Sequence, residues 1–90
     1  MIVCQIGQPG DGPIHNVTVE NLIAENTGDD SIALFNVASG GVIRNCQIKD
    51  SFARGILLYN SRDTKLVNNT VIRCPVTYVN TEEVDNIINH

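Results

Sequence analysis

The sequence predicts an all-β chain that folds as a short right-handed parallel β-helix of about three to four coils. Short apolar and β-branched runs alternate with Asn, Gly, Asp and Ser, and no apolar stripe of helical period is long enough for a helix. One unit recurs about every 24 residues, which is shorter than the roughly 33 residues that helical repeats need. The usual hand of parallel strand connections favours a right-handed coil.

The composition fits one small folded segment. Of the 90 residues, 42% are hydrophobic and 18% are charged, so the chain is too apolar and too weakly charged to be disordered. The net charge is −4 and the six Lys and Arg are scattered, so we expect no nucleic-acid partner. No apolar run approaches the ~18 residues of a membrane span, so we expect no membrane partner. Met1–Ile6 lacks the basic start and apolar length of a signal peptide.

The repeat joins the chain into one unit. Ile14–Asn36 aligns with Ala38–Asn60 when the numbering is shifted by 24, and the shift shortens to 20 after Pro75. We therefore expect residues 1–90 to form a single β-helix segment, with the best-defined repeats over residues 14–74. Stacking in register places residues one coil apart about 4.8 Å from each other.

The expected strands follow from this alignment in chain order. Residues 2–6 predict a first strand, and a Gly/Pro-rich turn follows it. Two stripes of strands then recur once per coil. The first stripe covers residues 32–36, 56–60 and 76–80, and the second covers residues 19–21, 43–45, 67–69 and 86–89.

An asparagine column is expected at the end of each stripe. The columns are Asn36, Asn60 and Asn80 in the first stripe, and Asn21, Asn45 and Asn69 in the second. Asn tolerates the left-handed conformation that a sharp corner needs, and stacked amides hydrogen-bond along a column. We therefore interpret both columns as structural.

Charged residues one coil apart provide an internal test of the stacking. Opposite charges attract across neighbouring strands and like charges repel. The predicted attractive pairs are Glu20 with Arg44, Glu25 with Lys49, Asp30 with Arg54, Arg62 with Glu82, and Lys65 with Asp85. The predicted repulsive pairs are Lys49 with Arg73 and Asp63 with Glu83. Attractive pairs outnumber repulsive ones, which supports the alignment.

Cysteine and histidine form no disulfide or metal pattern. Cys4, Cys46 and Cys74 are odd in number and contain no CxxC pair, so we expect thiols that act as small apolar residues. His15 and His90 have no partner His or Cys at the spacing of zinc ligands, so we expect no zinc site.

With its asparagine columns and stacked apolar runs, the chain resembles the pectin-lyase-like right-handed parallel β-helix superfamily over roughly residues 14–74. That superfamily includes hydrolases, lyases, epimerases and phage tail proteins. The resemblance is therefore specific for the fold but not for the activity. It implies a carbohydrate partner and an extracellular or periplasmic location.

One segment narrows the resemblance. Asn26–Leu34 contains Gly-Asp-Asp and resembles the motif of polygalacturonases in which paired aspartates supply the general acid and part of the water-activating base. Arg54 stands where that family has a histidine, and Ala-Arg-Gly-Ile-Leu around it is at least as similar to α-1,3-galactosidase-type β-helix glycosidases. The Asn-Thr-Asp and Arg-Ile-Lys motifs of polygalacturonases are absent. Catalytic domains of that family are also several times longer, so we expect the 90-residue chain alone to be inactive.

The chemistry that these residues favour is glycoside hydrolysis of a polysaccharide or oligosaccharide, which uses one protonated and one ionised carboxyl group. Asp29 and Asp30 are the catalytic candidates, because repulsion between carboxylates that share a groove favours protonation of one of them. Arg54, one coil from Asp30, and Tyr59, stacked over Phe35, are the substrate-binding candidates.

Two alternatives remain open at this point. In a non-enzymatic carbohydrate-binding or structural stalk of a phage or cell surface, Gly28–Ser31 is an ordinary polar turn and Asp30 forms a surface ion pair with Arg54. In a calcium-assisted polysaccharide lyase, Asp29 and Asp30 hold the ion; no other cofactor or metal is expected. Asp11 is either a turn residue or a third carboxylate.

The short column exposes unpaired strand edges at both ends. The repeat register continues to His90, and residues 1–13 predict a strand and a turn but no capping helix. Solenoids normally close their ends with atypical rungs. We therefore expect further β-helix coils or end-to-end self-association.

Overall fold

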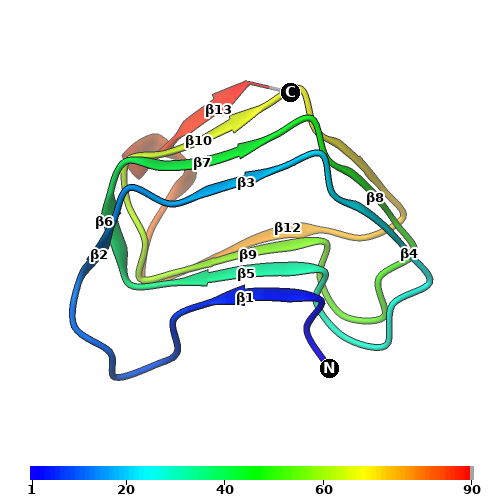
Figure 1. The fold of residues 1–90 in the computed structure, drawn as a ribbon, viewed down its shortest axis with the longest axis horizontal. Helices are drawn as coiled ribbons and strands as arrows, with labels where there is room; N and C mark the ends of the chain where they lie inside the picture. The colour runs from blue at the N-terminus through cyan, green and yellow to red at the C-terminus, as the bar shows by residue number, and fades with distance from the viewer. Residues whose placement is uncertain (90) are drawn as a thin grey trace.

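The structure, a computed structural model, describes residues 1–89 and consists of parallel strands stacked in coils (Figure 1). Sheet A contains β1 (Cys4–Ile6), β5 (Ile32–Phe35), β9 (Ile56–Tyr59) and β12 (Val76–Val79). Sheet B pairs β2 (Ile14–His15) with β6 (Val37–Ser39). Sheet C contains β3 (Thr18–Glu20), β7 (Gly41–Arg44), β10 (Thr64–Val67) and β13 (Ile87–Asn89). Sheet D contains β4 (Ile23–Glu25), β8 (Gln47–Lys49) and β11 (Thr70–Ile72).

Every strand pair is parallel, and each strand pairs with the strand one coil earlier or later. The four strands of sheets A and C and the three of sheet D agree with the predicted three to four coils. The only helical element in residues 1–89 is a 3-10 turn, η1 (Glu83–Asp85). In that range no helix is long and apolar enough to cross a membrane. The prediction of an all-β chain is confirmed.

The core fills the space between the sheets. Alternate residues of each strand point inward, because side chains of a β-strand alternate between its two faces. The fully buried members include Ile32, Leu34, Ile43, Ile48, Ile56, Leu58 and Leu66. Three further buried residues, Ala33, Phe35 and Leu57, form a separate cluster on the outer face of sheet A.

The coils of sheet A differ in length. Cys4 pairs with Ile32, Ile32 with Ile56, and Ile56 with Val76, so the numbering advances by 28, then 24, then 20 from one strand to the next. The surplus of the first coil lies in the loop of residues 7–13.

The shortening of the third coil occurs at two corners. The corner between sheets D and A has six residues in the first two coils, 26–31 and 50–55, but three in the third, 73–75. One more residue is lost between β9 and β10, because Gly41 pairs with Thr64 at an offset of 23.

This lost residue corrects one predicted asparagine column. The left-handed corner residues at the end of sheet C are Asn21, Asn45 and Asn68, with φ of 58°, 54° and 55°. Asn69 instead accepts a hydrogen bond from the backbone N of Cys46 (3.0 Å) and donates from Nδ2 to the carbonyl of Ile43 (2.9 Å). The prediction of Asn69 as the corner was wrong because the offset here is 23 and not 24.

The other asparagine column agrees with the prediction. Asn36, Asn60 and Asn80 all have positive φ, at 63°, 49° and 55°. Asn60 donates from Nδ2 to Oδ1 of Asn36 at 2.9 Å, so the amides stack as expected. The column follows the last residues of β5, β9 and β12.

Three predicted charge pairs in the first two coils are aligned. Arg44 Nε lies 2.7 Å from Glu20 Oε2, and Arg54 Nε lies 2.9 Å from Asp30 Oδ1. Glu25 is aligned with Lys49 across β4 and β8.

The predicted charge pairs of the third coil were wrong. Lys49 is aligned with Ile72, and Arg73 forms two hydrogen bonds with Asp50, so the predicted repulsion between Lys49 and Arg73 does not arise. This hydrogen bonding with Arg73 lowers the pKa of the Asp50 carboxyl.

At the next coil the offset between β10 and β13 is 22 and not 20. Lys65 is therefore aligned with Ile87, and the backbone N of Asp63 donates to the carbonyl of Asp85. The predicted pairings of Lys65 with Asp85, Arg62 with Glu82 and Asp63 with Glu83 rested on the shorter offset and were wrong.

The three thiols are free; Cys46 belongs to the core cluster, and Cys4 and Cys74 pack against it. Cys46 is buried, and Cys4 and Cys74 are half-buried. Burial, with a smaller contribution from Cys46, raises the pKa of the Cys4 thiol. His15 Nδ1 lies 2.7 Å from Ser39 Oγ, one coil away, and His90 lies outside the described residues.

Candidate functional site

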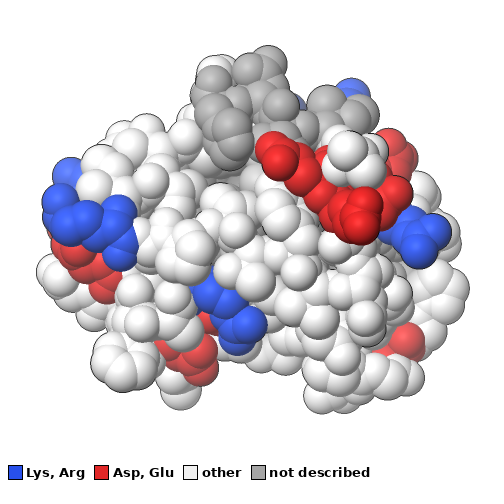
Figure 2. Space-filling view, turned by 180° about the vertical axis from the view of Figure 1, so that it is seen from behind, with Lys and Arg blue, Asp and Glu red and all other residues white. Residues whose placement is uncertain are grey.

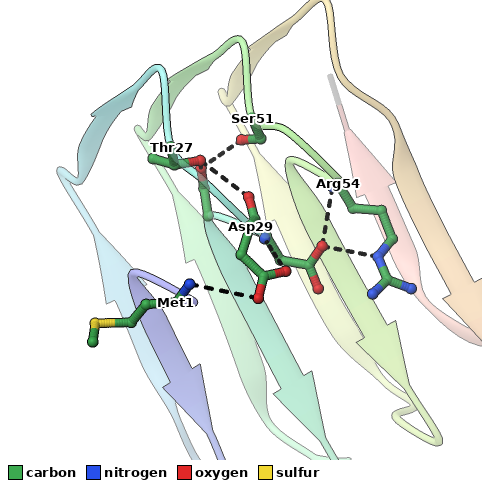
Figure 3. A network of polar contacts seen from close by, with 7 residues as sticks. Met1, Thr27, Asp29, Ser51 and Arg54 are labelled. Atoms are coloured by element: carbon green, nitrogen blue, oxygen red, sulfur yellow. Dashed lines mark hydrogen bonds and ion pairs between the residues drawn. The ribbon is translucent and has the colours of Figure 1, made fainter.

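The Gly-Asp-Asp segment lies at the corner between sheets D and A, where residues 26–31 stack on residues 50–55 (Figure 3). Their backbones are joined by hydrogen bonds, including Phe52 N to Thr27 O at 2.8 Å. Inside the corner, Ser31 Oγ lies 2.6 Å from Ser51 Oγ and 3.1 Å from Thr27 Oγ1. This chain of three hydroxyl groups fixes the two loops against each other, and both serines are buried.

Asp30 is enclosed by the next coil. Its side chain is 1% exposed, and its Oδ1 accepts hydrogen bonds from the backbone N of Arg54 (3.0 Å) and from Nε of Arg54 (2.9 Å). The Arg54 side chain is 37% exposed. The carboxylate of Asp30 therefore holds the guanidinium in place, and Arg54 presents the accessible part of the pair.

Asp29 lies beside this pair and is more accessible. Its side chain is 41% exposed, and its Oδ1 accepts a hydrogen bond from the backbone N of Asp30 at 2.7 Å. Its Oδ2 lies 3.7 Å from the amino group of Met1 (Figure 3). Of the two aspartates, Asp29 is the one that offers carboxylate oxygens to a ligand.

Tyr59 lies at the far end of the same sheet. Its ring packs on Phe35 with centroids 5.2 Å apart and an interplanar angle of 45°, in the cluster on the outer face of sheet A. Arg54 lies in the corner two residues before β9 and Tyr59 ends that strand, so their backbones are at most about 16 Å apart. Arg54 and Tyr59 therefore border one elongated face and do not line a single compact pocket.

The outer face of sheet A between these ends is apolar. Ala33 and Leu57 are almost fully buried there, and Ile2 and Val79 pack against the same cluster. Ile2 directly follows Met1, whose amino group approaches Asp29, so the carboxylate lies at the border of this face. The arrangement therefore combines a buried apolar cluster with an accessible acid and guanidinium at one end.

A hollow at the other end of this face was missed as a site in the sequence. Asp11, Pro13, Asn36, Ala38, Asn60 and Arg62 line it. Its volume is about 260 Å³. The sequence alone predicts Asp11 as a turn residue or a third carboxylate. The surplus length of the first coil was the sequence signal that could have indicated the hollow.

Among residues 1–89, no three His, Cys, Asp or Glu side chains gather as a group that could hold a metal ion. Calcium takes six to eight oxygen ligands, and the carboxylate of Asp50, in the neighbouring coil of the same corner, is already bound by Arg73. In Figure 2, charged side chains on the face shown form separate small groups of both signs, with acidic ones gathered around η1.

The fold and this layout define the chain as a parallel β-helix with a candidate ligand-binding face on sheet A. The family model described as the right-handed β-helix region matches residues 12–89. The chain belongs to this right-handed β-helix family, and the predicted hand of the coil is confirmed. Comparisons with curated proteins and with solved structures give no match.

Proposed function

We propose that this chain is a segment of a β-helix carbohydrate-active enzyme, a glycoside hydrolase, which binds a polysaccharide or oligosaccharide along the outer face of sheet A. The observation that carries the proposal is the layout of this face. Asp29 and Arg54 stand at one end, and the Phe35–Tyr59 pair stands at the other. Ala33 and Leu57 between these ends are buried, so the groups at the two ends would hold the ligand.

The length of the face matches an extended ligand. The four residues of β9 alone extend about 10 Å, and Arg54 lies beyond the start of this strand, so the face exceeds a single sugar ring. Tyr59 offers an aromatic surface to the apolar side of a ring. Arg54 offers donors to hydroxyl or carboxylate oxygens, and its orientation is already fixed by Asp30.

In this proposal Asp29 and Asp30 form the carboxylate pair. Asp29, whose oxygens reach solvent, gives a proton to the glycosidic oxygen as the bond from that oxygen to the anomeric carbon breaks, and it then takes a proton from the water that attacks this carbon. Asp30 provides the fixed negative charge, which Arg54 balances. Arg54 also contacts the sugar.

A second function, a non-enzymatic carbohydrate-binding β-solenoid, is favoured by one observation. Oδ1 of Asp30 accepts two hydrogen bonds from Arg54 and the side chain is 1% exposed, so the Asp29–Asp30 pair offers a ligand only one accessible carboxyl group. Glycoside hydrolysis ordinarily uses two. Under this alternative the same face binds sugar without cleaving it.

The test measures binding and hydrolysis separately. The full chain and the Asp29→Asn, Asp30→Asn and Tyr59→Ala variants are titrated with oligosaccharides and assayed for new reducing ends, with Asp63→Asn as the control. Circular dichroism verifies the fold of each variant. Hydrolysis that falls about 10²- to 10⁴-fold in Asp29→Asn, with binding retained, supports the enzyme.

Two other results would decide against it. Binding that weakens in Tyr59→Ala supports the binding solenoid if hydrolysis is missing both from the unmodified chain, which is expected to be inactive alone, and from a chain lengthened by further β-helix coils. If the unmodified chain binds no oligosaccharide, both functions are wrong.

A further inference from the structure

We propose that the hollow lined by Asp11, Pro13, Asn36, Ala38, Asn60 and Arg62 is a subsite for one neutral sugar ring. This inference rests on the proposed function, because the ring would belong to the carbohydrate bound on sheet A. Asn36 and Asn60 directly follow Phe35 and Tyr59, so the hollow continues the aromatic end of that face.

One wall of the hollow is formed by a loop that is longer than the corresponding corner of the next coil. The first coil of sheet A advances the numbering by 28 and the next by 24, and the surplus forms the loop of residues 7–13 that carries Asp11 and Pro13. Gly7 begins this loop with φ of +74°, and a Cβ there would lie 2.6 Å from the carbonyl oxygen of Phe35. Insertions into one rung of a solenoid often form its binding loops.

The loop is held in place before any ligand arrives. The backbone N of Gln8 donates to Oδ2 of Asp11 at 3.1 Å, and the backbone N of Asp11 donates to the carbonyl of Gln8 at 3.1 Å. Asn36 donates from Nδ2 to the same carbonyl at 2.9 Å, while its Oδ1 accepts from Asn60. The asparagine column therefore ties the loop to the coils, and a pre-formed site loses little free energy to ordering on binding.

The polar groups around the hollow fit hydroxyl groups. Asp11 follows β1 and Arg62 follows β9. These two strands are separated by β5, so the backbones of the two residues lie two coils, or about 10 Å, apart along the helix axis. Of the ion pairs within residues 1–89, none joins Asp11 to Arg62. A carboxylate accepts and a guanidinium donates, whereas each sugar hydroxyl does both, so one ring can bridge them.

Charge and size narrow the ligand further. The one acid and one base of the lining have opposite formal charges, so neither a uronic acid nor a cationic sugar gains net attraction. Ala38 and Pro13 add apolar surface for the C–H face of a ring. Pockets for drug-sized ligands measure about 300–1,000 Å³. The volume of about 260 Å³ is therefore suited to one ring.

The experiment compares oligosaccharide length, charge and the two wall residues. The full chain is screened on a glycan array of neutral and uronic-acid oligosaccharides of increasing length, and hits are measured by calorimetry. The variants are Asp11→Asn and Arg62→Gln, and the matched controls are the exposed Asp63→Asn and Lys65→Gln. We expect a neutral oligosaccharide to bind more tightly as it lengthens, until its end ring reaches the hollow.

In Asp11→Asn and Arg62→Gln, the longest neutral ligand should then lose about tenfold in affinity, with shorter ligands and both controls unchanged. Unchanged affinity of both variants for every length would overturn the subsite and leave the proposed function standing. Preference for uronic-acid oligomers that disappears in Arg62→Gln would overturn the neutral-sugar assignment. Failure of the unmodified chain to bind any array sugar would overturn the proposed function as well.

Discussion

The backbone amide and Nε of Arg54 both donate to one oxygen of Asp30, across a full coil of the helix. Only the arginine is accessible, since the side chains are 37% and 1% exposed. The carboxylate of Asp30 is buried, whereas Glu20 and Arg44, which are also one coil apart, are both exposed. The same repeat spacing therefore produces one positioned functional group and one ordinary surface ion pair.

Removing the Arg54 side chain should destabilise the fold more than removing Arg44. Arg54→Ala leaves the buried Asp30 carboxylate with only one backbone donor from that residue, which should cost about 1–3 kcal/mol in the free energy of unfolding. Arg44→Ala breaks an exposed pair and should cost less than about 1 kcal/mol. Urea unfolding of both variants measures the difference. Equal, small losses would contradict the enclosed state of Asp30.

The corrected corner of sheet C makes a prediction about two neighbouring asparagines. Asn68 has φ of 55°, so Asn68→Gly should leave stability nearly unchanged, while Asn68→Ala should cost about 1–2 kcal/mol. Asn69→Gly should be destabilising by about 1–3 kcal/mol, because Cys46 N and Ile43 O lose their partner. Thermal or urea unfolding compares the variants. If glycine is tolerated at 69 and not at 68, the register derived from the repeat alone was right.

The contrast between these asparagines shows what the repeat could and could not predict. Ile32 and Ile56 pair as expected, because apolar alternation strongly specifies which face of a strand is buried. Asn68 and Asn69 carry the same side chain, so the sequence does not show which of them stacks on Asn45. The coil is one residue shorter here, and the alignment with an offset of 24 therefore placed Asn69 at the corner that Asn68 occupies in the structure.

The candidate site divides in the same way. The 24-residue repeat predicted that Arg54 lies next to Asp29 and Asp30. It could not predict which aspartate is exposed, because exposure depends on the backbone conformation of the loop. The hollow joins Asp11 to Arg62 through an irregular loop outside the repeat, so no alignment of coils brings them together.

Stability should fall at alkaline pH through two groups. Burial raises the pKa of the Cys4 thiol, and burial with the nearby Glu83 raises the pKa of Tyr78. In both cases the folded state keeps the proton longer than the unfolded chain. The stabilisation is therefore complete below the unfolded pKa, about 8.5 for Cys and 10 for Tyr, and is lost as the pH rises through the folded values.

Melting temperatures of the unmodified chain, Cys4→Ala and Tyr78→Phe from neutral to alkaline pH measure this effect. The Cys4 variant should show a shallower decline above about pH 8.5 and the Tyr78 variant above about pH 10. Below those values each curve should run parallel to that of the unmodified chain. Curves that stay parallel throughout would rule out both contributions.

Unpaired strand edges at the two ends predict self-association. The edge strands of sheets A, C and D are β1, β3 and β4 at one end and β11, β12 and β13 at the other (Figure 1). Glu20 and Glu25 lie at the first end and Glu82 and Glu83 near the second, so like charges oppose end-to-end contact. Light scattering after size-exclusion chromatography should show mass rising with protein concentration, and more strongly at high salt, because salt screens the repulsion. A constant monomer mass under all conditions would contradict this expectation.

The most direct test of the binding face is an amide NMR titration of the full chain with an oligosaccharide hit from the array. The account predicts perturbed signals along the outer face of sheet A, at Arg54, Leu57, Tyr59 and Asn60, with Lys65 on sheet C unchanged. Perturbations confined to sheets C and D, or none at saturating sugar, would contradict it.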